Sequence, residues 1–388
     1  MKKKILLMGR SGCGKTSMRA LVFSSTLYPN AASTKRLGTT LGVETSHFRI
    51  LRNLVISLFD MGGQQAYIDS YLDDRKSQVF KDVGAFVYVF DMGNSAEQGE
   101  DDDAWEADGR YWRDCVRLLN QHSPTAQIFC LLHKMDLVQE SSRRDIYAQR
   151  VRELRSKARD LLGPESDIDA RLRCCGTSIW DETLYRAWSK IIHSLIPNIA
   201  VLESNLDQFA GVSGATEAVV FERKTFLVVA RSGEAKERGA VAGTGDSKET
   251  ASQPQPPQPS SSVAAASKVS SPRRSKGAPP ALGQDDTALI MEGYPPSDAE
   301  RKSILSSGQL HPERFEKISE LVKNLRGSCS KLQASFQSLE VRGETFAAYL
   351  DVLTADTYIL VIVADPSVEL SAVKLNVHMA RERFEKLS

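Results

Sequence analysis

The sequence predicts an α/β protein: a doubly wound, mostly parallel sheet, followed by a smaller α+β domain. Its length of 388 residues is usual for two or three domains. In the first half, short apolar runs alternate with helical patterns, which is typical of βαβ units and a parallel sheet. Residues 233–309 are rich in Pro, Ser, Ala and Gly, which predicts a disordered insertion. We therefore expect a first domain over residues 1–198 and a second over 199–388, interrupted by the 233–309 insertion.

The elements of the first domain follow from its apolar runs and their periodicity. Apolar runs predict strands at Ile5–Met8, Leu54–Phe59, Ala85–Phe90, Ile128–Leu132 and Leu172–Cys175. Helical patterns predict helices at Thr16–Ser25, Tyr67–Lys81, Trp105–Asn120, Asp145–Leu162 and Glu182–Leu195. In the last of these, apolar residues recur on one face, which predicts that the helix packs on the core: Leu184, Trp188, Ile191 and Leu195.

The second domain reads as a small antiparallel sheet with helices on it. Strands are expected at Ala218–Glu222, Thr225–Ala230, Ser335–Val341, Thr345–Leu353 and Thr357–Ala364. Helices are expected at Leu202–Phe209, around Phe315–Leu325 and at Val373–Leu387. The 233–309 insertion lies within this domain and offers almost no core residues. Because loop-closure entropy grows slowly with length, we expect that deleting the insertion preserves the fold.

Composition excludes several classes of function. Lys plus Arg is 50 and Asp plus Glu is 49, a net charge of +1, which argues against a dedicated nucleic-acid binder. The longest apolar run, Tyr358–Ala364, is far shorter than the roughly 20 residues of a membrane-spanning helix. Lys2 follows Met1, and the chain ends in FEKLS, so neither N-myristoylation nor prenylation is expected. The sequence therefore predicts no direct membrane insertion.

A phosphate-binding loop is the first motif that carries chemistry. The pattern G-x-x-x-x-G-K-[ST] matches Gly9, Arg10, Ser11, Gly12, Cys13, Gly14, Lys15 and Thr16, and Ser17 follows it. The motif follows a predicted strand and opens a predicted helix, so its backbone N–H groups are expected to surround phosphate oxygens. Lys15 is expected to neutralise the β- and γ-phosphates, and Thr16 to ligate magnesium. The alternative is a glycine-rich turn without a ligand.

A second motif, D-x-x-G-Q, follows the predicted strand at Leu54–Phe59. Asp60 is expected to hold magnesium through water, Gly63 to meet the γ-phosphate with its amide, and Gln64 to orient an attacking water. Between the two motifs, Thr40 is expected to close over magnesium when a γ-phosphate is present, with Thr39 as the second choice. The alternative reading of this stretch is a polar lead-in to a strand.

Two further motifs are expected to read the base of a nucleotide. Asp136 can accept hydrogen bonds from guanine N1–H and its amine, and Lys134 can lie along the base and sugar. His133 stands where the usual N-K-x-D motif has Asn, and a packing role is its alternative. Ser178 and Ile179 follow a predicted strand, at the place where a backbone N–H can meet guanine O6. Together with the phosphate loop, these motifs predict a P-loop GTPase that binds GTP or GDP. A nucleoside kinase is disfavoured, since no arginine-rich lid is visible.

With these motifs in this order, the chain resembles the Rag/Gtr GTPases of the A/B type. The resemblance rests on KKKILLMGRSGCGKTSMR, KRLGTT, GGQ, YVFD, FCLLHKMDLVQE, TSIWDETLYRAW, LIPN, RFEKIS, SCSKLQASFQSLEVR and FEKL. HKMD is characteristic of that family, so His133 supports the assignment. The resemblance covers nearly the whole chain except residues 233–309 and the acidic stretch Glu100–Asp108, which is expected to be a solvated loop.

The resemblance implies more than the residues themselves do. It implies a roadblock-like second domain, a heterodimer with a C/D-type Rag GTPase, and a membrane-anchored scaffold complex. It also implies signalling of amino-acid sufficiency to the TOR kinase complex at the cytoplasmic face of the vacuole or lysosome. We expect the second domain to form the heterodimer, because its last helix exposes an apolar face or the sheet exposes an edge unless a like domain covers it. The alternative function is a nucleotide-bound structural arm whose hydrolysis is unimportant.

Overall fold

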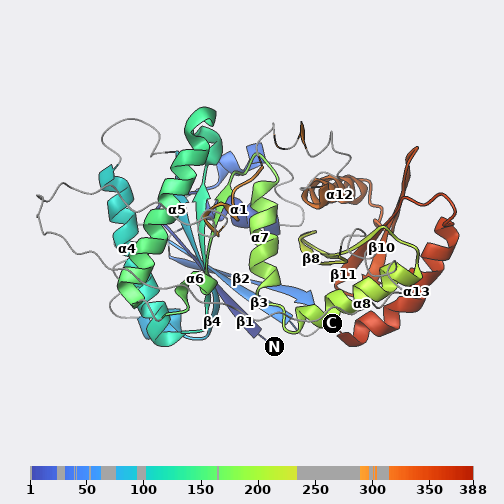
Figure 1. The fold of residues 1–388 in the computed structure, drawn as a ribbon, viewed down its shortest axis with the longest axis horizontal. Helices are drawn as coiled ribbons and strands as arrows, with labels where there is room; N and C mark the ends of the chain where they lie inside the picture. The colour runs from blue at the N-terminus through green and yellow to red at the C-terminus, as the bar shows by residue number, and fades with distance from the viewer. Residues whose placement is uncertain are drawn as a thin grey trace, which may run out of the picture.

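The computed structural model describes two sheets and the helices that cover them (Figure 1). The described residues are 2–23, 31–38, 40, 42–51, 54–62, 76–93, 102–163, 166–233, 289–296, 300, 302–303 and 314–387. In this part of the chain, no helix is both long and apolar enough to cross a membrane.

The first sheet has six strands in the order β2-β3-β1-β4-β5-β6. The strands are β1 (Lys2–Met8), β2 (Val43–Leu51), β3 (Leu54–Met61), β4 (Val83–Asp91), β5 (Gln127–His133) and β6 (Leu172–Thr177). All neighbours pair in parallel except β2, which runs antiparallel to β3. The predicted α/β class and the predicted strands of this domain are confirmed. Strand β2 was not predicted, because this edge strand is largely exposed and carries no apolar run.

Helices cover both faces of this sheet (Figure 1). The helical elements are α1 (Lys15–Phe23), η1 (Ala31–Arg36), α3 (Lys76–Phe80), α4 (Asp102–His122), η2 (Met135–Leu137), α5 (Glu140–Leu162), α6 (Ile168–Arg171) and α7 (Thr183–His193). Side chains alternate along β1, so Ile5 and Leu7 join the core under α1 and α7, while Leu6 and Met8 join the core under α4 and α5. Of the predicted helix Tyr67–Lys81, the residues before Lys76 lie outside the described ranges.

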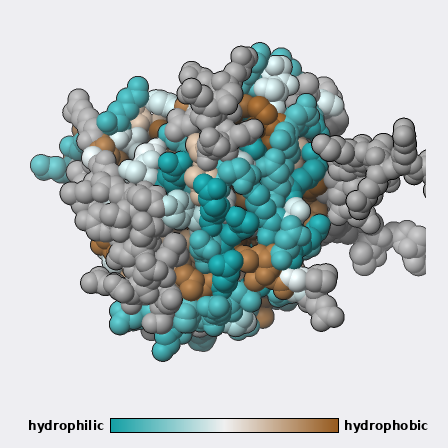
Figure 2. Space-filling model, turned by 90° about the vertical axis from the view of Figure 1, so that its left-hand side faces the viewer, coloured by the Kyte–Doolittle hydropathy of each residue, from teal (hydrophilic) through white to brown (hydrophobic). Residues whose placement is uncertain are grey.

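The outer face of α4 and α5 is mostly hydrophilic (Figure 2). The helix predicted from Trp105 is confirmed as α4, but the expectation of a solvated loop at Glu100–Asp108 is wrong. The helix begins at Asp102, and both Trp105 and Asp108 are buried. Trp105 packs beside Phe90 of β4 with ring centroids 4.9 Å apart, so the acidic stretch is interrupted by core positions. The high density of acidic residues obscures these core positions in the sequence.

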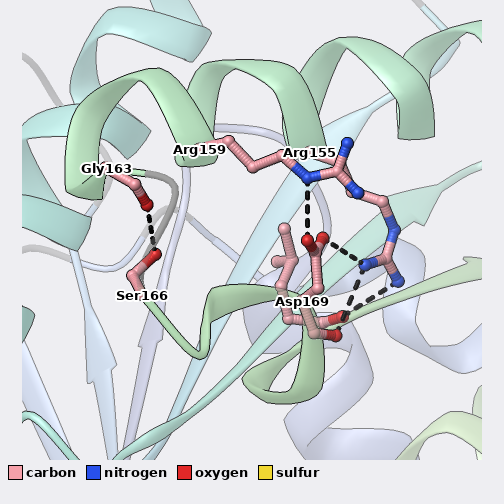
Figure 3. A network of polar contacts seen from close by, with 6 residues as sticks. Arg155, Arg159, Gly163, Ser166 and Asp169 are labelled. Atoms are coloured by element: carbon pink, nitrogen blue, oxygen red, sulfur yellow. Dashed lines mark hydrogen bonds and ion pairs between the residues drawn. The ribbon is translucent and has the colours of Figure 1, made fainter.

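A network of ion pairs joins the end of α5 to the start of β6 (Figure 3). Asp169 lies 3.1 Å from Arg155 Nη1 and 2.7 Å from Arg159 Nε, which lowers the pKa of its carboxyl despite partial burial. Arg155 also donates to Leu172 O at 3.1 Å. The network therefore positions the first residue of β6, the strand that leads to one of the base-reading motifs.

The second sheet has five antiparallel strands, as predicted, and their order is β8-β7-β11-β10-β9. The strands are β7 (Glu217–Glu222), β8 (Val228–Arg231), β9 (Leu339–Arg342), β10 (Ala347–Thr354) and β11 (Thr357–Val363). Helices α8 (Ile199–Val212) and α13 (Leu370–Leu387) share a core with one face, and α12 (Arg314–Lys331) packs on the other.

The prediction that the last helix, α13, exposes an apolar face is wrong. Val373, Val377 and Phe384 of α13 are buried in the core that its own sheet supplies. Strand β9 is different, because it is the edge of the sheet and its residues from Glu340 to Arg342 are exposed. The open edge of the described sheet therefore remains as the surface that a partner could cover.

The expectation that the 233–309 insertion offers almost no core residues is wrong for its described end. Ile290 is only 4% exposed and belongs to the core under α4 and α5. Tyr294 packs beside Tyr147, with ring centroids 5.1 Å apart. Residues 289–296 thus pack against the first domain. Pro and Ser around them masked this short apolar signal in the composition.

The two domains are in direct contact. Helix α12 contacts α1, and strand β8 contacts α7. Lys323 of α12 donates to the carbonyl oxygens of Leu21 and Val22, at 2.5 and 2.9 Å, near the end of α1. A cation near a helix C-terminus is favourable, because the last carbonyl groups carry partial negative charge. Val228 N of β8 donates to Ser189 Oγ of α7 at 3.1 Å. The helix that begins with the phosphate-loop residues Lys15 and Thr16 therefore ends against the second domain.

Candidate nucleotide site

The phosphate loop lies between β1 and α1 and borders a cavity of about 280 Å³. Gly9 has φ +143°, and a Cβ there would lie 2.5 Å from Val89 O, so only glycine fits. The cavity is lined by Ser11, Gly12, Gly14, Lys15, Thr16, Ser17, Thr34, Lys35, Leu37, Gly38 and Thr40. Its volume and its polar lining suit the phosphate part of a nucleotide.

Two predicted loop residues turn their side chains away from this cavity. Arg10 donates to Ala104 O of α4 at 3.4 Å, and Cys13 is 1% exposed. Burial raises the pKa of the Cys13 thiol, so it stays neutral at pH 7. These residues can therefore meet a phosphate only through their backbone amides. Their side chains hold the loop against its neighbours.

Lys15 is buried and folds back over its own loop. Its Nζ donates to Gly9 O at 2.8 Å and to Arg10 O at 2.9 Å. The ammonium group lies at the loop itself, where the phosphate oxygens of a nucleotide would be cradled. Lys15 can therefore supply the positive charge expected of it.

Three predicted metal-site residues come together at one point. Thr16 Oγ1 lies 2.7 Å from Thr40 Oγ1 and 3.1 Å from Asp60 Oδ2. Asp60 is fully buried, burial raises the pKa of its carboxyl, and its Oδ1 has no hydrogen-bond partner. A buried carboxylate oxygen without a partner is costly, and a hydrated divalent cation would satisfy it. Two hydroxyls and one carboxylate are the hard oxygen donors that magnesium prefers, so these residues fit that ion.

Arg19 is a neighbour of this cluster that the sequence motifs do not include. It lies one turn after Thr16 on α1, with Nε 3.2 Å from Asp60 Oδ2. It also pairs with Glu44 of β2 and donates to Ser46 Oγ at 3.2 Å. Arg19 thus links the buried carboxylate to the strand that follows Thr40. Its i, i+3 spacing from Thr16 was the available signal.

His133 lies behind the site rather than in its lining. It is 1% exposed, and its Nδ1 is 3.0 Å from Thr177 Oγ1. A Cβ built on Gly14 would lie 2.9 Å from His133 Nε2, so the phosphate loop packs directly on the ring. Burial lowers the His133 pKa to about 3, so the ring is neutral at pH 7. This geometry supports the packing alternative for His133, and its place in the nucleotide-binding set stays a prediction.

The remaining base-reading residues gather where β5 and β6 end. Ser178 Oγ donates to Asp136 Oδ1 at 2.6 Å, which joins the two predicted motifs. Ser178 N donates to Thr183 Oγ1 at 2.9 Å, so the amide of Ile179 is the better candidate for guanine O6. Lys134 has φ +62°, and its Nζ lies 2.6 Å from Asp91 Oδ2. The ion pair thus ties the Lys134 side chain to the end of β4.

Part of the predicted set lies outside the described residues. Gly63 and Gln64 are among these, as is Thr39. The structure therefore places Asp60 and Gly62, but it does not place the residue expected to orient water. The catalytic role of Gln64 stays a prediction.

Comparisons with known proteins agree with this geometry. The conserved region of Gtr1/RagA G proteins matches residues 4–247. The chain is similar to "Ras-related GTP-binding protein A" of Dictyostelium discoideum, at 37% identity over 386 residues, covering 100% of this chain and 98% of that protein. It is also 37% identical over 385 residues to "GTP-binding protein gtr1" of Schizosaccharomyces pombe, covering 99% and 96%.

A more distant similarity extends to the other type of the family. "Ras-related GTP-binding protein C" of Mus musculus is 27% identical over 229 residues, covering 59% of this chain and 53% of that protein. The full-length matches, together with the phosphate loop, the Thr16–Asp60 contact and the Asp136–Ser178 contact, lead to one assignment. The chain belongs to the Gtr1/RagA family of small GTPases, and it is a guanine-nucleotide-binding GTP hydrolase.

Proposed function

We propose that this GTPase is a magnesium-dependent switch and one subunit of a Rag-type heterodimer that signals amino-acid sufficiency to the TOR kinase complex. The observation that carries the switch is the cluster of Thr16, Thr40 and Asp60. Thr40 comes from the loop before β2, while Thr16 and Asp60 belong to the rigid first sheet and its helix. A bound γ-phosphate can hold such a loop, and hydrolysis can release it.

Each residue has a distinct part in the proposed reaction. Magnesium, when bound, supplies charge that neutralises the phosphate oxygens. Lys15 and the loop amides orient the phosphates and stabilise the charge that develops on them. Gln64 orients the water that attacks the γ-phosphoryl group in line. Asp136 and the Ser178–Ile179 backbone select guanine.

The proposed catalytic residue is tested by Gln64→Leu. Because leucine cannot orient a water, we expect single-turnover GTP hydrolysis to slow by on the order of 10-fold or more, while GTP affinity stays largely intact. The adjacent Gln65→Leu is the matched control and keeps the wild-type rate. Hydrolysis by Gln64→Leu at the rate of the wild type and the control would remove Gln64 from catalysis. A wild-type rate no faster than that of GTP alone in buffer would favour the structural arm over the switch.

The surface proposed for the C/D-type partner combines the β9 edge with the outer face of α12. Leu321 is 60% exposed and Leu332, just beyond the end of α12, is 80% exposed, while Val341 of β9 is also exposed. An open strand edge favours pairing with a similar sheet, and exposed leucines favour burial against a partner. The similarity to a C-type protein supports a partner from a related chain.

The Leu321→Glu variant tests this surface. A charge at a buried interface lacks a partner, so we expect loss of the co-expressed C/D-type chain on purification. Leu375→Glu is the matched control, because Leu375 of α13 is 59% exposed but lies outside the proposed surface. Retention of the partner by both variants would place the heterodimer interface elsewhere.

Localisation is proposed to follow from this assembly. The heterodimer would reach the cytoplasmic face of the vacuole or lysosome through a membrane-anchored scaffold complex, and act there on the TOR kinase complex. The Leu321→Glu variant extends the test, because a chain without its partner should no longer sit on that membrane. Membrane residence of the partner-free variant would contradict the proposal.

A further inference from the structure

Strand β6 is the edge of the first sheet, and its outward-facing carbonyl groups are covered by α5. Leu172 O accepts from Arg155 Nη2 at 3.1 Å. Cys174 O accepts from Tyr147 Oη at 3.1 Å. An uncovered strand edge leaves polar backbone groups unpaired, and these contacts from α5 pair the first part of β6.

The next outward-facing group of β6 is covered by a distant part of the chain. Gly176 N donates to Gly293 O at 3.2 Å, within residues 289–296, which we call the edge segment. Ile290 anchors this segment in the core, and Tyr294 packs beside the ring of Tyr147. The segment therefore completes the edge of β6 at the end that the nucleotide motifs follow.

Helix α7 holds the edge segment from the other side. Arg186 Nη2 donates to Gly293 O at 3.3 Å, so this carbonyl accepts from two donors. Lys190 Nζ lies 3.7 Å from Glu292 Oε1 and donates to Glu292 O at 3.4 Å. The segment is thus in contact with α5, β6 and α7 together.

Gly293 makes this contact possible because of its close approach to β6. A Cβ at this position would lie 1.7 Å from Cys174 O and 2.8 Å from Tyr147 Oη. Its φ lies outside the left-handed region, so the backbone conformation itself is open to other residues. A side chain at position 293 is therefore excluded by space alone, and even alanine would displace the segment.

The loop that is predicted to read the base follows directly after the covered end of β6. Two residues after Gly176, Ser178 Oγ donates to Asp136 Oδ1, the carboxylate that faces guanine. A strand end that lacks a backbone partner frays more easily than a paired one. Loss of the bond to Gly176 would consequently let Ser178 move relative to Asp136.

We propose that the edge segment is a positioning element for nucleotide recognition. By pairing with Gly176, it holds the end of β6, and with it Ser178 and Ile179, in the arrangement that receives the base. The end of the 233–309 insertion therefore sets how long a guanine nucleotide stays bound. Phosphate binding does not depend on it, because the phosphate loop lies between β1 and α1.

The test is the Gly293→Ala variant of the full chain. We expect GDP to dissociate about 3- to 10-fold faster, the effect of loosening one or two hydrogen bonds in the site. We also expect faster hydrogen exchange at the amide of Gly176. Competition by inorganic tripolyphosphate, which has no base, should stay as in the wild type. A loss of affinity for GDP alone indicates a positioning role, because general destabilisation would weaken the binding of both GDP and tripolyphosphate.

A matched control and a second variant keep the result decisive. Gly211→Ala places a Cβ in open space on α8, and it should leave GDP release unchanged. If Gly293→Ala fails to fold, Ile290→Ser removes the apolar anchor without the clash and should show the same base-dependent loss. Rapid exchange at Gly176 with unchanged GDP release would overturn the proposal. Unchanged exchange at Gly176 would overturn it as well, because the segment would then not hold that amide.

Discussion

In Asp136→Asn, the affinity for GDP and GTP is expected to fall by about 10- to 100-fold, the effect of losing charge-assisted hydrogen bonds. The wild-type carboxylate offers acceptors to the N1–H and amine of guanine, and Ser178 Oγ already donates to its Oδ1 at 2.6 Å. In asparagine, one acceptor becomes a donor that faces the donors of guanine. Xanthine carries a carbonyl oxygen in place of the amine, so xanthosine nucleotides should bind better than before.

The measurement is competition between GDP and XDP for the variant and the wild type. Asp114→Asn is the matched control, because the Asp114 side chain is half-exposed on α4, where its carboxylate pairs with Arg117. It should leave the preference for GDP as it was. If Asp136→Asn still prefers GDP as strongly as the wild type, the H-K-M-D motif does not read the base.

The second large effect concerns Asp108, a buried carboxyl behind the phosphate loop. Asp108 is 5% exposed, and Tyr88 Oη donates to it. Burial raises the Asp108 pKa from 3.8 to about 6. Between these two values the folded protein binds more protons than the unfolded chain, so stability falls as pH rises. The shift corresponds to about 3 kcal/mol of unfolding free energy, lost from pH 4 to 6 and constant above.

Asp108→Asn tests this effect, because asparagine keeps an acceptor for Tyr88 but cannot ionise. We expect the variant to be more stable than the wild type at pH 7, and the difference to shrink toward pH 4. Comparison by denaturant unfolding at several pH values cancels the other carboxyls that titrate in both proteins. Asp114→Asn on the same helix should follow the wild type throughout. A difference that is independent of pH would show that Asp108 does not carry this titration.

Much of the fold follows from local pattern. Central strands such as β1 and β5 are buried on both faces, so they read as continuous apolar runs. The phosphate loop is equally easy to recognise in the sequence, because positive φ angles at Gly12 and Gly14 admit few residues other than glycine. Strand β2 and the start of α4 were missed for the opposite reason. Their sequences are polar, and only the neighbouring strand or core decides their structure.

The candidate site divides in the same way. The sequence by itself predicted which residues bind phosphate, metal and base, since these tasks require particular residue types at short spacing. Only the tertiary structure decided that His133 packs behind Gly14, and that Arg19 pairs with Asp60. It alone showed that Gly293 covers the edge of β6. These contacts join residues far apart in the chain, and a hydrogen bond depends on atoms within about 3 Å, a distance that no local pattern specifies.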